Sequence, residues 1–242
     1  MNFSNRSYQQ ELLDQTDIPF PAIRKNMEEL ETINKWLGGH RITILGLKHF
    51  IKAGKKLSVC EIGCGGGDNL KALYQYAQKK DIEIEMIGID IKKECIDYAK
   101  ENCASIPKVN WICSDYRHAL LPSRPDIIFS SLFCHHFSDE GVVEILNWMK
   151  ENSRIGFFVN DLHRHPFAYY SIKWLTAMFS RSYLVINDAP LSVQRGFSRQ
   201  ELDNIIRRIL NSDSEWTCNL YWKWAFRWLM IFYKNDPSPW HD

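Results

Sequence analysis

The chain has 242 residues, of which 45% are hydrophobic and 24% are charged. At roughly 150 residues per domain, this length predicts one large domain with an appended segment, and the composition excludes a disordered tail protein and a disulfide scaffold. Thirty Lys and Arg residues stand against 29 Asp and Glu residues, which gives a formal net charge of +1. Because no dense basic run accompanies this balance, we expect no nucleic-acid partner.

Seven cysteines are present, and none of them belongs to a CxxC pair. They lie in apolar stretches, as reduced thiols of cytosolic proteins do, so we predict neither a disulfide framework nor a metal site. The N-terminal residues lack an apolar segment after a basic start, and no uncharged apolar run reaches the ~18 residues that cross a bilayer. The expectation is a cytoplasmic protein without a transmembrane segment.

Residues 1–55 are predicted to form a helical cap. A second helix of this cap is expected from Arg41 towards Lys52. The first helix should end at the glycine pair Gly38-Gly39, since glycine commonly follows the last helical turn. Its apolar face consists of Met27, Leu30, Ile33 and Leu37.

From residue 56 onward, short apolar runs alternate with amphipathic segments. We predict buried strands at 56–62, 83–90, 110–113, 126–131 and 155–160, with helices between them. Such alternation predicts a parallel sheet that carries helices on both faces. The fold class is therefore α/β, with a doubly wound, Rossmann-like sheet.

The C-terminal third departs from this rhythm in two places. Residues 216–234 alternate their aromatic side chains at period two, which predicts two antiparallel core strands that complete a seven-stranded, mostly parallel sheet. Residues 163–195 are expected to be a helical lid insertion in a domain spanning 56–242. The lid should contain an apolar helix at 167–179, which must bury its sides, and a loop around Pro190. A dimer interface and an interfacial membrane helix are alternative interpretations of that helix.

The segment EIGCGGGDN, residues 61–69, follows a predicted strand and precedes a predicted helix. Glycines at such a turn let the backbone approach a ligand, and the amides at a helix N-terminus favour a polar or anionic group. The dinucleotide fingerprint GxGxxG would require glycine where this chain has Asp68, whereas the third glycine in the alternating series Gly63, Gly65 and Gly67 comes one position earlier. The spacing therefore argues against a nicotinamide oxidoreductase.

The order D/E-x-G-x-G-x-G, which begins at Glu61, resembles the first motif of class I S-adenosylmethionine-dependent methyltransferases. The similarity continues with Asp90 after the second strand, with Asp126 in a DxxxxS motif, and with SLFCHHF, which is similar to the LHHF element of the ubiquinone-biosynthesis type. The resemblance implies S-adenosylmethionine as cofactor, with Asp90 on the ribose and Asp115 on the adenine. The implied cofactor-binding set is Glu61, Gly63, Gly65, Gly67, Asp90, Ile91, Ser114, Asp115, Tyr116 and Ser130.

Three further segments, at 17–41, 160–170 and 180–202, look like small bacterial metabolite methyltransferases, some of them associated with type III polyketide synthases. This narrower resemblance implies a small aromatic or polyketide-type acceptor. O-methylation is favoured over C-methylation, because a histidine can accept the proton of a phenol. A non-catalytic, cofactor-binding regulatory protein is the alternative, and an oligomer is compatible with the sequence.

His163 and His165 follow the fifth strand and are the predicted general bases, and His136 is a third candidate. The competing interpretation is that all three are hydrogen-bonded loop residues. Asn160 and Asp161 are candidates to orient such a base or to hold the acceptor hydroxyl, and the competing interpretation is a strand end followed by an Asp that caps a helix. Tyr116 has two interpretations, stacking on adenine and filling the core.

Overall fold

The computed structural model describes residues 3–15, 17–51, 56–211 and 213–235. Within these residues, seven strands form one sheet in the order β3-β2-β1-β4-β5-β7-β6. Strands β1 to β5 are parallel, and β7 runs antiparallel to both β5 and β6, so the predicted α/β fold class is confirmed. The strands are β1 Leu57–Ile62, β2 Ile84–Asp90, β3 Val109–Cys113, β4 Ile127–Ser131, β5 Gly156–Leu162, β6 Trp216–Lys223 and β7 Arg227–Lys234.

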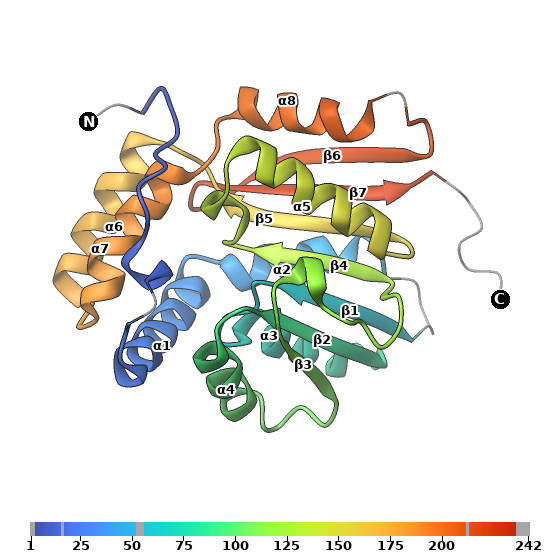
Figure 1. Cartoon of the computed structure of the whole chain (residues 1–242), viewed down its shortest axis with the longest axis horizontal. Coiled ribbons are helices and arrows are strands. Elements are labelled where there is room, and N and C mark those ends of the chain that lie inside the picture. Colours follow the sequence, from blue (N-terminus) through green and yellow to red (C-terminus); the bar gives the residue numbers. More distant parts are fainter. Residues whose placement is uncertain (1–2, 16, 52–55, 212, 236–242) are drawn as a thin grey trace.

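Helices cover both faces of the sheet, because the central strands are apolar on both sides and need cover. Helices α2, α3 and α4 pack on one face, and α5 and α8 pack on the other (Figure 1). The helices are α1 Phe20–Trp36, α2 Gly39–Lys48, α3 Asp68–Gln78, α4 Lys93–Asn102, α5 Asp139–Asn152, α6 Pro166–Phe179, α7 Tyr183–Arg195 and α8 Arg199–Leu210. Short 3-10 turns are η1 Leu12–Asp14, η2 Tyr116–His118 and η3 Cys134–His136.

Helices α1, α6 and α7 do not lie on either face. They gather at one end of the sheet, together with the N-terminal segment (Figure 1). This end holds the carboxyl ends of the parallel strands, where ligands of open α/β sheets bind. The extra helices therefore enclose the edge at which the sequence places its candidate site.

The N-terminal cap is helical only in part. Gly38 adopts a left-handed φ of 77° between α1 and α2, as the predicted helix end requires, but α2 begins at Gly39 and ends at Lys48. The predicted end at Lys52 lies outside the described residues. Residues 3–15, hereafter the strap, contain only the turn η1, and the carboxylate of Asp188 accepts hydrogen bonds from the backbone N–H groups of Leu12 and Leu13 at the start of this turn. The division at residue 55 stays a prediction.

The segment around Pro190 is a helix and not the expected loop. Pro190 lies inside α7, flanked by the buried side chains Val185 and Leu191. Proline removes one backbone donor, but burial of apolar side chains at about 1.5–3 kcal/mol each outweighs that loss. The sequence interpretation gave the proline too much weight against the amphipathic pattern around it.

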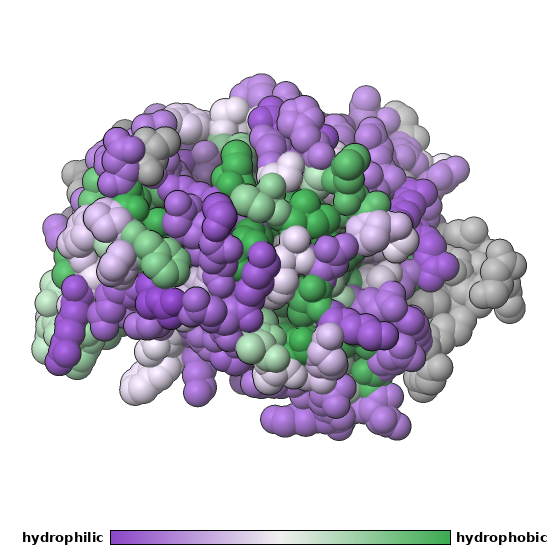
Figure 2. All heavy atoms as spheres, turned by 60° about the horizontal axis from the view of Figure 1, so that its bottom comes forward, coloured by the Kyte–Doolittle hydropathy of each residue, from purple (hydrophilic) through white to green (hydrophobic). Residues whose placement is uncertain are grey.

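Apolar side chains of α6 and of the β6–β7 turn are more exposed than expected. Trp174 of α6 is 60% exposed and Phe179 is 72% exposed, so this helix leaves part of its apolar surface uncovered. Trp216 and Trp228 lie in the core as predicted, whereas Trp222 and Trp224 are 50% and 74% exposed. Figure 2 shows apolar side chains reaching the surface between hydrophilic ones on the face that it presents. In the described part of the chain, no helix is long and apolar enough to cross a membrane.

Candidate active site

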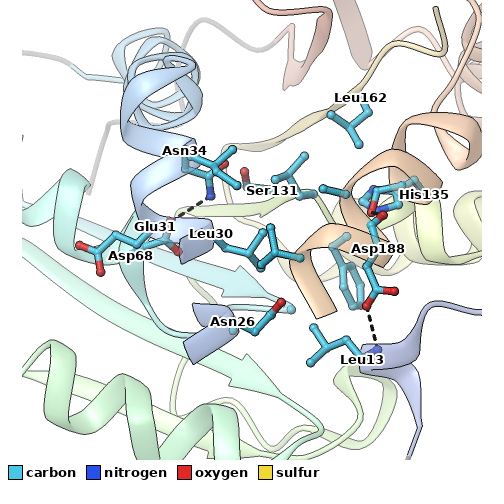
Figure 3. A pocket seen from close by; sticks show the side chains of 18 of the residues that line it. Leu13, Asn26, Leu30, Glu31, Asn34, Asp68, Ser131, His135, Leu162 and Asp188 are labelled. Atoms are coloured by element: carbon cyan, nitrogen blue, oxygen red, sulfur yellow. Dashed lines mark hydrogen bonds between the residues drawn. The ribbon is translucent and has the colours of Figure 1, made fainter. Parts of the chain in front are cut away.

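One cavity of about 710 Å³ lies at the carboxyl edge of the sheet. Its walls come from the strap, α1, the glycine loop, η3, α6, α7 and the β6–β7 turn. Figure 3 shows side chains from these separate elements converging on it, among them Leu13, Leu30, Ser131 and Leu162. The volume lies within the roughly 300–1,000 Å³ that small-molecule and cofactor sites occupy.

The glycine loop contributes its backbone to this cavity. Gly63, Gly65 and Gly67 adopt φ values of 66°, 49° and 74°, in the left-handed region that favours glycine. A Cβ atom on Gly63 would lie 2.2 Å from the ring of Phe133, so no side chain fits there. Gly63 and Gly65 line the cavity, whereas Gly67 caps α3 and faces the ring of Trp111. The loop thus presents bare backbone to a ligand.

Asp90 ends β2 with its carboxylate in the cavity wall. Its oxygens accept the backbone N–H groups of Gly65 and Lys92, each at 2.9 Å. A carboxylate has about four acceptor positions, so two remain for ligand hydroxyls. Burial raises the pKa of Asp90 above its ordinary value. Ile91 lines the cavity beside it and is 67% exposed.

Glu61 supports the loop from beneath and does not line the cavity. Its Oε1 atom accepts a hydrogen bond from Asn69, which does line the cavity, and its buried Oε2 atom has no partner. Burial, reinforced by the negative charge of Asp68, raises the pKa of Glu61 well above its ordinary value.

The residues predicted for adenine lie outside the cavity lining. Asp115 caps η2 and pairs with Arg117 at 2.6 Å, which lowers the pKa of its carboxyl group. Tyr116 is a core residue that packs edge-on against Phe133 and Trp148. Ser114 and Ser130 also lie outside the lining, so the structure does not bring this part of the predicted set to the cavity.

His163 and His165 also lie outside the cavity lining. The Nδ1 atom of His163 accepts a hydrogen bond from the indole of Trp222 at 3.1 Å, and burial lowers the pKa of His163. The Nδ1 atom of His165 accepts the backbone N–H of Phe167 and caps α6. Both predicted bases therefore have structural partners in place of access to the cavity.

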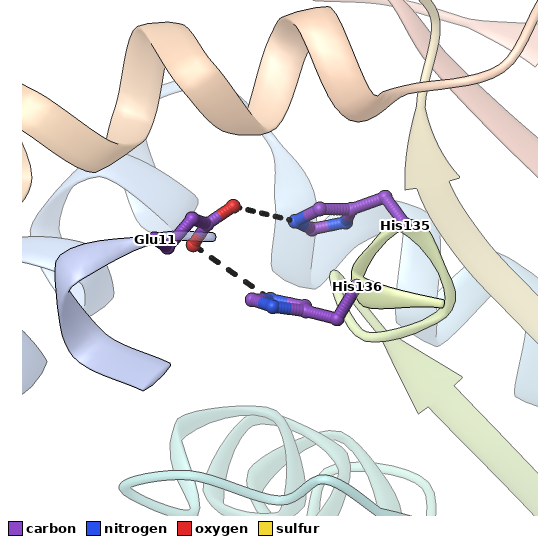
Figure 4. Close-up of side chains that lie close together, drawn as sticks. All are labelled: Glu11, His135 and His136. Atoms are coloured by element: carbon purple, nitrogen blue, oxygen red, sulfur yellow. Dashed lines mark ion pairs between the residues drawn. The ribbon is translucent and has the colours of Figure 1, made fainter. Parts of the chain in front are cut away.

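A different histidine pair reaches the cavity, beside a glutamate that sequence reasoning did not identify. Glu11, His135 and His136 all line it, and Figure 4 shows both rings turned towards the Glu11 carboxylate. His135 Nδ1 lies 2.7 Å from Asp161, and His136 Nδ1 lies 3.3 Å from Asp14. We name these five residues the histidine–carboxylate cluster. The strap is distant in sequence from η3, so no local pattern links Glu11 to the histidines.

The charges of the cluster act on one another. Burial alone lowers the pKa of His135, but the neighbouring charges of Asp161 and Glu11 raise it to about 9. Burial would raise the pKa of Asp161, but His135 lowers it overall. The cluster therefore favours positive charge at the imidazole.

A second polar group borders the opposite part of the cavity. Asp68 accepts hydrogen bonds from His40 at 2.7 Å and from Asn34 at 3.1 Å, and Arg227 donates to Asn34 at 3.0 Å. Arg227 is buried, and that burial lowers its pKa to about 10. Asp68, which breaks the dinucleotide fingerprint, thus anchors α1 and α2 to the glycine loop.

Comparisons with known proteins agree with this architecture. Residues 59–156 match a sequence family described as a methyltransferase domain. The plantazolicin methyltransferase BpumL in complex with SAH shares 16% identity at a TM-score of 0.65, with 90% of this chain and 89% of that chain covered. Magnesium protoporphyrin IX methyltransferase (ChlM) from Synechocystis PCC 6803 with bound SAM shares 11% identity at a TM-score of 0.54, with 91% and 86% covered. No curated protein sequence matches this chain.

Residues 59–156 match a methyltransferase domain and the sheet is Rossmann-like, so the domain match and the fold together support a methyltransferase enzyme. The glycine backbone, the Asp90 carboxylate and the adjoining cavity fit S-adenosylmethionine as the cofactor, and similar folds have been crystallised with that compound or its product.

Proposed function

We propose that this methyltransferase acts on a small, lipophilic acceptor of aromatic or polyketide type, with O-methylation favoured over C-methylation. The observation that carries the proposal is the single cavity in which the glycine loop and Asp90 meet a mostly apolar wall. A donor site and an acceptor site within one enclosure are what direct methyl transfer requires.

The donor end of the cavity contains four residues of the predicted set. In the proposal, the backbones of Gly63 and Gly65 hold the methionine part of the cofactor, Asp90 accepts the ribose hydroxyls, and Ile91 packs beside them. Glu61 and Gly67 shape the loop without contact. An adenine contact from Asp115 requires release of Arg117, and the proposal does not depend on it.

The acceptor end is formed by apolar side chains of α6 and the β6–β7 turn, among them Ile172, Leu175, Trp224 and Phe226. Such a wall favours a lipophilic ring system. Two proteins of similar fold support this class, because one was crystallised with azolic desmethylPZN analogs and the other is named for magnesium protoporphyrin IX. Each of those names describes its own protein, and here they support only the size and apolar character of the acceptor.

S-adenosylmethionine supplies an already activated methyl group, so the chain mainly has to align the acceptor and exclude water. Positioning of this kind contributes roughly 7–11 kcal/mol to a rate enhancement. Of the three predicted bases, only His136 lines the cavity. We therefore place the acceptor hydroxyl at the histidine–carboxylate cluster and no longer at His163 and His165.

A thermal-shift titration with S-adenosylmethionine, S-adenosylhomocysteine and NADH tests the donor site. A ligand at 100 times its dissociation constant adds about 2.7 kcal/mol of stability, and we expect this from the two adenosyl compounds alone. Phenolic and polyketide acceptors are then screened by mass spectrometry for a single added methyl group. Stabilisation by NADH alone would favour the oxidoreductase alternative. Adenosyl binding with no product from any acceptor class would favour the regulatory alternative.

A further inference from the structure

We propose that Glu11, His135 and His136 bind a divalent transition-metal ion, in contrast to the expectation of no metal site. Their ligand atoms, one carboxylate oxygen and two ring nitrogens, lie within 4.8 Å of one another. Two histidines and one carboxylate form a donor set that suits Zn²⁺, Co²⁺ or Fe²⁺. The three residues come together only in the folded chain, where Glu11 of the strap lies next to His135 and His136 of η3 (Figure 4).

The distances distinguish a shared ion from a hydrogen bond. Glu11 Oε1 lies 3.5 Å from His135 Nε2, and Glu11 Oε2 lies 3.8 Å from His136 Nε2. Both separations exceed the roughly 2.7–3.2 Å of an N–H···O hydrogen bond. Two ligand atoms that each lie about 2.1 Å from one tetrahedral metal are roughly 3.4 Å apart. Each of these two ring nitrogens therefore lies from its Glu11 oxygen at a separation closer to that of two ligands of one ion than to that of a direct hydrogen bond.

His135 Nε2 is the second observation that points to a ligand. His135 is 3% exposed, and its Nε2 atom has no hydrogen-bond partner. The other ring nitrogen, Nδ1, lies 2.7 Å from Asp161, so one ring proton lies there and Nε2 faces Glu11. A cation belongs between this nitrogen and the carboxylate, and a metal ion would take the place that a second ring proton takes in the metal-free chain.

The surroundings match those of metal-binding histidines. Such histidines usually donate their second N–H to a carboxylate, which fixes the ring and raises its basicity. The carboxylate of Asp161 contacts Nδ1 of His135, and the carboxylate of Asp14 contacts Nδ1 of His136. Arg195, at 3.5 Å from Asp14, offsets one of the three carboxylates of the cluster. When both imidazoles are neutral, the negative charges of the two other carboxylates remain, and a divalent ion balances them.

All three ligands line the cavity, so an ion held by them has free coordination positions on the cavity side. Three protein ligands with an open position are typical of catalytic metal sites, whereas structural sites have four. Because we place the acceptor hydroxyl at this end, a role that rests on the proposed function, the open position would take that oxygen. A metal-bound hydroxyl loses its proton more easily than a free one.

Binding of Co²⁺ to the full chain after chelator treatment tests the site without any acceptor. We expect one ion per chain, a visible d–d absorption band, and displacement by Zn²⁺. His136→Gln, at a partly exposed position, should weaken binding at least tenfold, and His118→Gln, at an exposed histidine elsewhere, should leave it unchanged. Asp161→Asn, which alters only the residue behind His135, should weaken binding by roughly 10- to 100-fold.

The proposal is overturned if wild type binds no ion, or if His136→Gln and Glu11→Gln bind it as wild type does. Circular dichroism and the S-adenosylhomocysteine thermal shift show that each variant is folded. These readouts also separate the two proposals. Methyl transfer by chelated protein would refute only the role of the ion in the reaction, whereas ion binding without transfer to any acceptor would refute the proposed function alone.

Discussion

His135 Nδ1 lies 2.7 Å from Asp161 Oδ1, and both side chains are almost completely buried. The second oxygen of Asp161 accepts the backbone N–H of His135 at 3.1 Å. Asp161 belongs to β5, and His135 belongs to η3, which follows the neighbouring strand β4. The pair therefore joins two adjacent strand ends at the carboxyl edge of the sheet and fixes the ring with its free nitrogen towards the strap.

This pairing predicts a fall in stability at alkaline pH for the metal-free chain. The neighbouring charges of Asp161 and Glu11 outweigh burial and raise the pKa of His135 from 6.5 to about 9. A histidine with a raised folded pKa contributes stability that is complete below the unfolded pKa and lost as pH rises through the folded pKa. The free energy of unfolding in urea should therefore decrease between about pH 6.5 and 9, by a few kcal/mol at about 1.4 kcal/mol per pKa unit. His135→Asn should be less stable throughout and lack this slope, and an equal slope in the variant would contradict the assignment.

Gly63→Ala should weaken cofactor binding. The added Cβ would lie 2.2 Å from the ring of Phe133, and the left-handed φ of 66° disfavours alanine by about 1–2 kcal/mol. Gly38→Ala is the matched control, because its φ is 77° while its nearest contact would lie at an ordinary 3.7 Å. Calorimetry with S-adenosylhomocysteine should show a loss for Gly63→Ala that exceeds the loss for Gly38→Ala. Equal affinities in the two variants would remove the loop from the cofactor site.

Asp90→Asn tests the ribose contact. Hydrogen bonds to a charged group contribute about 1.5–3 kcal/mol, so affinity for S-adenosylhomocysteine should fall roughly 10- to 100-fold. Asp115→Asn should leave affinity nearly unchanged, because Asp115 lies outside the cavity lining and pairs with Arg117. A large loss for Asp115→Asn and none for Asp90→Asn would reverse the two assignments.

The strands were predictable, because parallel strands buried on both faces are short, nearly continuous apolar runs in the sequence. The positions of the glycine loop and Asp90 in the cavity wall were predictable for the same reason, since both lie at a strand end, and their roles in cofactor binding stay predictions. The positions of the residues predicted to contact adenine were less predictable. Asp115 has an arginine two positions later, and that local ion pair holds the carboxylate beside η2, outside the cavity lining.

The strap and the histidine–carboxylate cluster were not predictable, since they depend on contacts between distant parts of the chain. Glu11 has no local periodicity that marks it, and its position follows from Asp188 of α7, which binds the backbone of Leu12 and Leu13. The sequence predicted a loop where α7 lies, so the partner that holds the strap was missing from the interpretation. His163 was chosen for its strand-end position, but its bond with Trp222 depends on the strand β6.

Arg6→Ala should strongly destabilise the protein, because Arg6 anchors the strap. Its side chain is 1% exposed, and its guanidinium pairs with Asp139 at 2.6 Å and donates to the backbone carbonyls of His135 and Phe137. Loss of one partner of a buried charged network costs about 3–5 kcal/mol. Arg24→Ala, which breaks an exposed pair with Glu101, should cost less than about 1 kcal/mol. Urea denaturation measures both, and equal costs would show that the strap is not anchored through Arg6.

Trp224→Ala tests the acceptor end once an acceptor is found. Trp224 lies in the β6–β7 turn, lines the cavity and is 74% exposed, so its removal should leave the fold intact. Covering one such ring contributes about 1.5–3 kcal/mol, which predicts a KM for the acceptor roughly 10- to 100-fold higher. Affinity for S-adenosylhomocysteine should not change, because the glycine loop and Asp90 are untouched. Trp36→Ala removes a tryptophan that is 82% exposed and lies outside the cavity lining, so it should behave as wild type. A higher KM in both variants would indicate a general effect, and an unchanged KM in Trp224→Ala would move the acceptor away from this turn.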